Sequence, residues 1–118
     1  MEKLKAVFHV NEADRWSIAL MNIANLLKDV GAAAVDIVVI ANGGAIVAYG
    51  EAEKLELMGP LQDQGVHFQV CNNSLHMLCE KGVVCFKPEM LPFFVEVIPA
   101  GITALIKKQQ EGYAYIKP

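Results

Sequence analysis

Cys71 is the residue of this sequence best suited to covalent chemistry, because it closes a predicted strand and opens a predicted helix. The first turn of a helix carries free backbone N–H groups and a partial positive charge, and both stabilise a thiolate relative to a thiol. A thiolate at this position would be a nucleophile and an acceptor of sulfur. Asn72 and Asn73 follow directly and carry amides that can donate hydrogen bonds to it. The alternative is an unreactive core cysteine, because cysteine is among the most frequently buried residues.

Other polar and small residues follow the predicted strands and are expected to lie beside Cys71. Ligands of open parallel sheets bind beyond the carboxyl ends of the strands, so residues at those ends should share one rim. We predict a substrate-binding rim made of Asn42, Gly43, Gly44, Asn72, Asn73, Pro99 and Gly101. The glycines in this set would leave space above the sulfur.

The remaining cysteines, Cys79 and Cys85, leave more than one interpretation open. Cys79 lies four residues after Leu75 on the same helical face, which predicts a core position. A Cys71–Cys79 bridge is not expected, because eight helical residues span about 12 Å and a disulfide needs Cα atoms within about 7 Å. Cys85 follows in a loop, either as a packing residue or as a resolving thiol. Three cysteines without a secretion signal predict reduced thiols and a cytoplasmic protein, and the absence of CxxC argues against structural zinc.

The histidines and glycines do not match a metal or cofactor motif. His9, His67 and His76 have no ligand spacing, so we expect no metal. His9 lies near the end of the first predicted strand, where it is either a base or a hydrogen-bonded structural residue. Gly43-Gly44 lacks the spacing of a phosphate loop, and the turn after the first strand has no glycine-rich cradle. The sequence therefore predicts no FMN, dinucleotide or other organic cofactor.

The composition predicts one soluble domain, residues 1–118, that assembles with copies of itself. Hydrophobic residues make up 54% of the chain, and the mean hydropathy is +0.35. A small domain keeps a large surface for its volume, so part of this excess should lie where another copy covers it; the alternative is a core rich in Ala and Val. Gly31 and Asp36 interrupt the most apolar stretch, which argues against a membrane span. The net charge is −3 without a basic stripe, so nucleic acid is not an expected partner.

Strand and helix patterns alternate along the whole chain and predict an α/β fold. Strands are expected at residues 3–10, 35–41, 66–71, 95–98 and 113–117, and helices at 12–30, 51–64, 73–81 and 100–111. Asn11 is the expected N-cap of the first helix, and Gly59-Pro60 should kink or split the second. Residues 45–50 are either a short helix or extended. This order predicts right-handed crossovers and a parallel sheet covered on both faces.

Several rim segments together resemble the DsrE/DsrF-like family of small sulfur-relay proteins. The resemblance covers essentially the whole chain and rests on Asn42-Gly43, on Val70-Cys71 with Gly82-Val83 after it, on Ile98-Pro99-Ala100-Gly101, and on Gln109-x-Glu111-Gly112-Tyr113-Ala114-Tyr115-Ile116. It implies a three-layer α/β/α sandwich with a five-stranded parallel sheet of order 4-3-2-1-5. It also implies homo-oligomers, which are dimers, trimers or hexamers in this family.

The same resemblance implies a function for Cys71. In sulfur-relay members, a cysteine at this position carries a persulfide and passes the sulfur between donor and acceptor proteins. The chain is then a sulfur carrier of the sulfurtransferase type, with no metal or organic cofactor. A second hypothesis is an oligomeric module that binds a small molecule or a protein, with Cys71 only as a wall of the site. A purely structural oligomer subunit is a third.

Overall fold

The computed structural model describes residues 2–118 and contains a single five-stranded sheet within that range. The strands are β1 (Leu4–Val10), β2 (Val35–Ala41), β3 (His67–Cys71), β4 (Val95–Ile98) and β5 (Ala114–Ile116), and the helices are α1 (Trp16–Val30), α2 (Ala52–Asp63), α3 (Asn72–Glu80) and α4 (Gly101–Gln110). Strands and helices alternate as the sequence pattern predicts, with boundaries that differ by a few residues.

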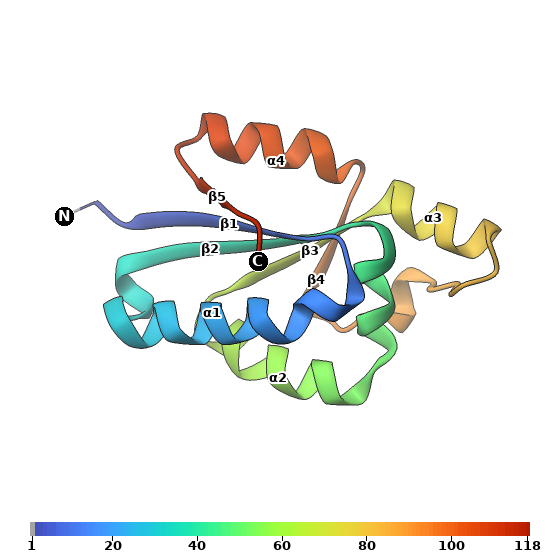
Figure 1. Ribbon diagram of the computed structural model, residues 1–118, viewed down its shortest axis with the longest axis horizontal. Coiled ribbons are helices and arrows are strands. Elements are labelled where there is room, and N and C mark those ends of the chain that lie inside the picture. The colour runs from blue at the N-terminus through green and yellow to red at the C-terminus, as the bar shows by residue number, and fades with distance from the viewer. Residues whose placement is uncertain (1) are drawn as a thin grey trace.

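All neighbouring strands run parallel in the order β4-β3-β2-β1-β5. Helices α1 and α2 cover one face, and α4 covers the other (Figure 1). Helix α3 extends beyond the carboxyl ends of the strands, and the amino-terminal end of α4 lies at the same edge. The predicted α/β fold, with its five-stranded parallel sheet and strand order, is confirmed.

The central strand β2 explains why the sheet needs cover on both faces. Its sequence, VDIVVIA, is apolar at nearly every position, and the five residues from Ile37 to Ala41 are buried. Val39 contributes to the core under α1 and α2, whereas Val38 and Ile40 contribute to the smaller core under α4. A continuous β-branched run is typical of a parallel strand with helices on both sides.

The start of α1 differs from the prediction. Asn11 does not cap the helix, because a 3-10 turn, Ala13–Arg15, comes first and Arg15 occupies the N-cap position. The side chain of Asn11 instead accepts a hydrogen bond from Lys117 Nζ at 2.8 Å. The sequence pattern identified the helical region, residues 12–30, but not this extra turn. Gly31 follows the last residue of α1, with a φ of 86°.

Helix α2 is also more regular than its sequence suggests. It continues through Gly59 and Pro60 without a break. Pro60 lies in the last turn, and the carbonyl group it leaves without an N–H partner belongs to Glu56, which is exposed. Water can satisfy that carbonyl, so the proline does not end the helix there. Residues 45–50, for which the sequence allowed either a short helix or an extended segment, belong to a 3-10 helix, Gly43–Gly50.

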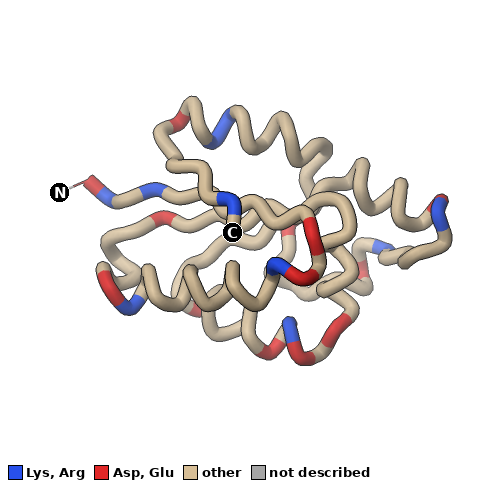
Figure 2. The backbone as a smooth tube through the Cα atoms, in the orientation of Figure 1, with Lys and Arg blue, Asp and Glu red and all other residues tan. Residues whose placement is uncertain are grey.

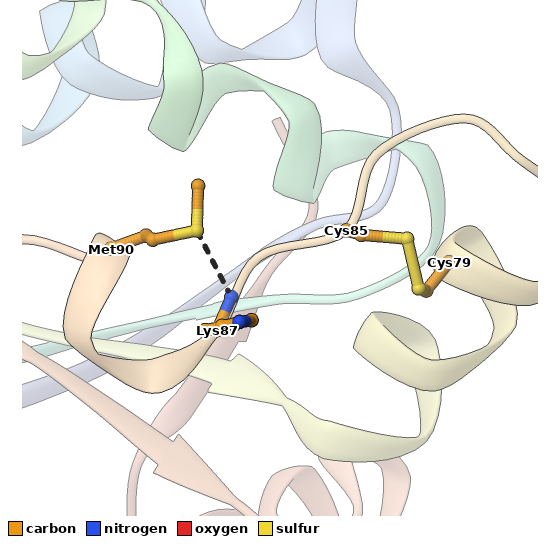
Figure 3. Close-up of a disulfide and its surroundings, with 4 residues drawn as sticks. All are labelled: Cys79, Cys85, Lys87 and Met90. Atoms are coloured by element: carbon orange, nitrogen blue, oxygen red, sulfur yellow. Dashed lines mark hydrogen bonds between the residues drawn. A yellow bond between two sulfur atoms is a disulfide. The ribbon is translucent and has the colours of Figure 1, made fainter.

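The expectation of three reduced thiols is wrong for two of them. Cys79 and Cys85 form a disulfide with a Cα–Cα distance of 4.4 Å, and both are exposed (Figure 3). Gly82, with a φ of 73°, turns the chain back after α3 and brings the two residues together. Cys79 is therefore not a core residue; Leu75 and Leu78 make the buried stripe of α3. Cys71 is the free cysteine.

Candidate functional site

The sheet register places Cys71 next to Asn42 at the carboxyl edge. The last paired residues of β2 and β3 are Ala41 and Val70, and one step further come Asn42 and Cys71. Neighbouring strands lie about 4.8 Å apart, and side chains alternate between the faces. Ile40 belongs to the core under α4, so Asn42 and Cys71 project toward the α4 side of the sheet.

The sulfur of Cys71 lies among hydrogen-bond donors in a buried position. The residue is 5% exposed and occupies the N-cap of α3, and its side chain makes no capping hydrogen bond. Burial of the sulfur raises the pKa of Cys71, but the hydrogen-bond donors that face it lower the pKa by more; they are the amides of Gly101, Ser74 and Asn73 and the Ser74 hydroxyl. The pKa of the thiol is therefore lower than its ordinary value. This arrangement favours a thiolate.

Ser74 is a residue of this site that the sequence analysis missed. Its hydroxyl oxygen accepts a hydrogen bond from the Gly43 amide at 2.9 Å, and its hydroxyl group contributes to the lowered pKa of Cys71. Ser74 is the third residue after the N-cap, a position whose side chain can reach back to the cap in a capping box. The spacing Cys-x-x-Ser at the start of a predicted helix was the available signal.

Gly101 allows its own backbone to approach the sulfur. A Cβ atom at this position would lie 3.3 Å from Cys71 Cβ and 3.6 Å from Asn42 Cβ. Any larger residue would therefore separate the α4 amide from Cys71 or displace its neighbours. Gly43 is constrained differently: its φ is 55°, and a Cβ there would lie 3.2 Å from the Asn11 carbonyl oxygen.

Dipoles, and not charged side chains, provide the electrostatic environment of Cys71. The segments that surround it, residues 37–50, 68–79 and 97–106, contain no Lys, Arg, Asp or Glu. Figure 2 shows that, within α3 and α4, charged residues occur only toward the carboxyl-terminal end of each helix. The backbone amides at two helix starts therefore supply the positive potential at the sulfur.

A chain of hydrogen bonds leads from β5 to the same edge. His9 Nε2 lies 2.9 Å from Asn42 Oδ1, and His9 Nδ1 lies 2.6 Å from the hydroxyl of Tyr115. His9 is 7% exposed, so both of its ring nitrogens are satisfied in a buried position. Of the two interpretations of His9, the structure shows the hydrogen-bonded one.

The structure does not bring every predicted rim residue onto Cys71. Asn73 contributes its backbone amide while its side chain is exposed, and Gly44 is exposed, with open space where a Cβ atom would stand. Asn72 lines a hollow of about 280 Å³ together with His76 and Phe86. Pro99 lines another of about 280 Å³ between the end of β4 and α4. The close set around the sulfur is Cys71, Asn73, Ser74 and Gly101, with Asn42 beside it.

Two further properties bear on the class of protein. No helix between residues 2 and 118 is both long and apolar enough to cross a membrane. In the same range, no group of three or more His, Cys, Asp or Glu side chains is arranged to hold a metal ion. The fold and the site thus define a small α/β protein with a free cysteine of lowered pKa at the carboxyl edge of a parallel sheet.

The chain belongs to the DsrE/DsrF-like family, whose sequence model matches residues 4–118. This family is associated with sulfur relay. A solved structure, that of the protein of unknown function MTH1491 from Methanobacterium thermoautotrophicum, superimposes with a TM-score of 0.84. It is 28% identical in sequence, and the match covers 98% of this chain and 100% of that one. No curated protein matches the chain.

Proposed function

We propose that this protein is a sulfur carrier that holds a persulfide on Cys71. The observation that carries the proposal is the place of the one free cysteine, at the start of α3 with the start of α4 packed against it, where hydrogen-bond donors lower the pKa of its thiol. The thiolate is the reactive form of cysteine, and the lowered pKa of Cys71 favours that form. Membership of a family associated with sulfur relay supports the same chemistry.

The transfer needs no external oxidant or reductant. The Cys71 thiolate attacks the outer sulfur of a donor persulfide, a new S–S bond forms on Cys71, and the donor S–S bond breaks. Its electron pair leaves on the donor thiolate. An acceptor thiolate then attacks the outer sulfur on Cys71, and Cys71 departs as the thiolate, which the same donors stabilise. Donor and acceptor are thiol-bearing proteins in this proposal.

Intact mass measurement tests the proposal directly. The protein is incubated with a persulfide donor, separated from it and weighed without reduction. We expect one added sulfur atom in the wild type and none in Cys71→Ser. The matched control is the double variant Cys79→Ser/Cys85→Ser, which lacks the disulfide and should still gain one sulfur. An unmodified wild type, although its Cys71 reacts with iodoacetamide, would contradict the proposal.

One observation favours a second function, that of a binding module without covalent chemistry. Cys71 is only 5% exposed, as expected for a residue that forms the wall of a site. The rate of alkylation distinguishes the two functions. A carrier cysteine reacts with iodoacetamide below pH 7, whereas a wall cysteine of ordinary pKa does not.

We also propose that the protein forms homo-oligomers and uses the outer face of α4 as an interface. Ile102 and Ile106 lie one turn apart on this helix and are 59% and 52% exposed. The first turns of α4 carry no charge (Figure 2). Light scattering after size exclusion should give the molar mass of a dimer, trimer or hexamer. The double variant Ile102→Glu/Ile106→Glu should have a lower molar mass. Lys107→Glu, exposed on a different face of α4, is the control and should leave the molar mass unchanged.

A further inference from the structure

Four side chains form a line across four neighbouring strands on the α4 side of the sheet. In sheet order they are Tyr115 on β5, His9 on β1, Asn42 after β2 and Cys71 at the end of β3. The first three are joined by hydrogen bonds. The line therefore connects a partly exposed tyrosine to the proposed sulfur-carrying residue.

The orientation of the Asn42 amide sets the proton position on His9. The carbonyl oxygen Oδ1 can only accept, so His9 Nε2 must carry the proton of the 2.9 Å bond. In the tautomer protonated only at Nε2, Nδ1 is the acceptor and the Tyr115 hydroxyl donates to it at 2.6 Å. Oδ1 of Asn42 thus accepts from His9. The Nδ2 group of the same amide donates no hydrogen bond within residues 2–118.

Asn42 lies between His9 on β1 and Cys71 on β3, so an amide whose Oδ1 is turned toward His9 has its Nδ2 on the side away from β1, which is the side of Cys71. Asn42 Cβ and Cys71 Cβ are both within 4 Å of the point where a Cβ on Gly101 would stand, at 3.6 and 3.3 Å. The donors that lower the pKa of Cys71 come from Asn73, Ser74 and Gly101, and Asn42 is not among them. An N–H donor beside the thiolate but not bonded to it is placed for an atom attached to that sulfur.

We propose that Tyr115 and His9 are positioning residues that hold the Asn42 Nδ2 group so that it donates to the outer sulfur of a persulfide on Cys71. The inference rests on the proposed function. A persulfide extends the side chain by one S–S bond of about 2 Å, which carries the negative charge beyond the reach of the α3 amides. A hydrogen bond to this anion is charge-assisted and stabilises the carried sulfur against loss.

The lifetime of the persulfide tests the role of each residue. After loading, the fraction that retains sulfur is followed by intact mass. Asn42→Ala should shorten the half-life about tenfold, the effect of one hydrogen bond to a charged group. His9→Leu and Tyr115→Phe should shorten it about threefold through misorientation of Asn42. In His9→Gln the new amide can still donate to Oδ1, so most of the wild-type half-life should return. His67→Gln, a change at an exposed residue, should have the half-life of the wild type.

The tautomer of His9 provides a second readout that a merely structural residue would not change. Nitrogen-15 NMR at pH 8 should show His9 protonated at Nε2 and not at Nδ1, and Tyr115→Phe should introduce the other tautomer. A Nδ1-protonated ring in the wild type would overturn the inference, because Asn42 would then present its oxygen to Cys71. Wild-type lifetimes in both Asn42→Ala and His9→Leu would also overturn it.

Failure of the proposed function gives a different result. If the wild type takes up no sulfur, the carrier hypothesis fails, and the NMR result alone upholds or overturns the orientation of Asn42. If the wild type carries sulfur but the variants lose it no faster, the carrier hypothesis stands and the positioning role fails.

Discussion

The hydroxyl of Ser74, in the first turn of α3, accepts a hydrogen bond of 2.9 Å from the amide of Gly43, in the turn after β2. This bond ties together the two segments that follow adjacent strands. It also orients the hydroxyl, since an oxygen that accepts from Gly43 can direct its own proton elsewhere, and that group helps to lower the pKa of Cys71. Ser74 therefore connects the geometry of the rim to the ionisation of the sulfur.

Removal of the Ser74 hydroxyl should destabilise the thiolate form of Cys71 relative to the thiol. We expect Ser74→Ala to raise the pKa of Cys71 and to reduce its alkylation rate at pH 7 about tenfold, the effect of one hydrogen bond to an ion. Stopped-flow alkylation over a range of pH measures both. Ser74→Thr retains a hydroxyl and is the matched control. Equal rates for Ser74→Ala and the wild type would show that the backbone amides suffice.

The ionisation of Cys71 should also appear in the stability of the fold. Because its pKa is lower in the folded protein than the unfolded value of about 8.5, ionisation favours the folded state. The stabilisation is fully present above the unfolded pKa and is lost as the pH falls through the folded pKa. The unfolding free energy of the wild type minus that of Cys71→Ser should therefore rise with pH across this interval. A difference independent of pH would contradict a lowered pKa.

Reagent size should matter for Cys71, because only 5% of the residue is exposed. We measure the ratio of the alkylation rate with iodoacetamide to the rate with a bulky maleimide. We expect this ratio to be about tenfold higher for Cys71 than for glutathione. Parallel rate measurements at pH 7 test this. A ratio equal to that of glutathione would indicate that the sulfur is freely accessible in solution.

Substitution of Gly101 should disturb the site through crowding. The new Cβ in Gly101→Ala would lie 3.3 Å from Cys71 Cβ, so we expect a loss of about 1 kcal/mol in unfolding free energy and slower alkylation. Gly59→Ala is the control, since nothing lies within 4 Å of a Cβ there and the residue is inside α2. That substitution should stabilise the protein by about 0.5–1 kcal/mol. Denaturant titration distinguishes the two.

The disulfide should stabilise the fold without affecting Cys71. Cys79 and Cys85 close a short loop at the end of α3 opposite Cys71, so Cys79→Ser/Cys85→Ser should lower the unfolding free energy by about 2 kcal/mol. Thiol titration of the denatured, unreduced wild type should count one free thiol. Three free thiols would contradict the pairing, and a changed alkylation rate of Cys71 in the double variant would show coupling along α3.

The sequence determined the architecture because local patterns encode it. The β-branched run of β2 and the helical stripe of α1 specify elements through their periods, and their alternation allows few topologies other than a parallel sheet. The position of Cys71 at a strand end and helix start follows from the same patterns. These are properties of short segments, which neighbours in the chain are sufficient to predict.

Only the tertiary structure decided which residues meet at the sulfur. Ser74 and Gly101 act on Cys71 through contacts between α3, α4 and the turn after β2, and Tyr115 reaches His9 from 106 residues away. Such contacts depend on strand order and register, which set distances of a few ångströms between segments that are remote in sequence. The Cys79–Cys85 pairing likewise depends on the turn at Gly82, whose positive φ the spacing of the cysteines did not reveal.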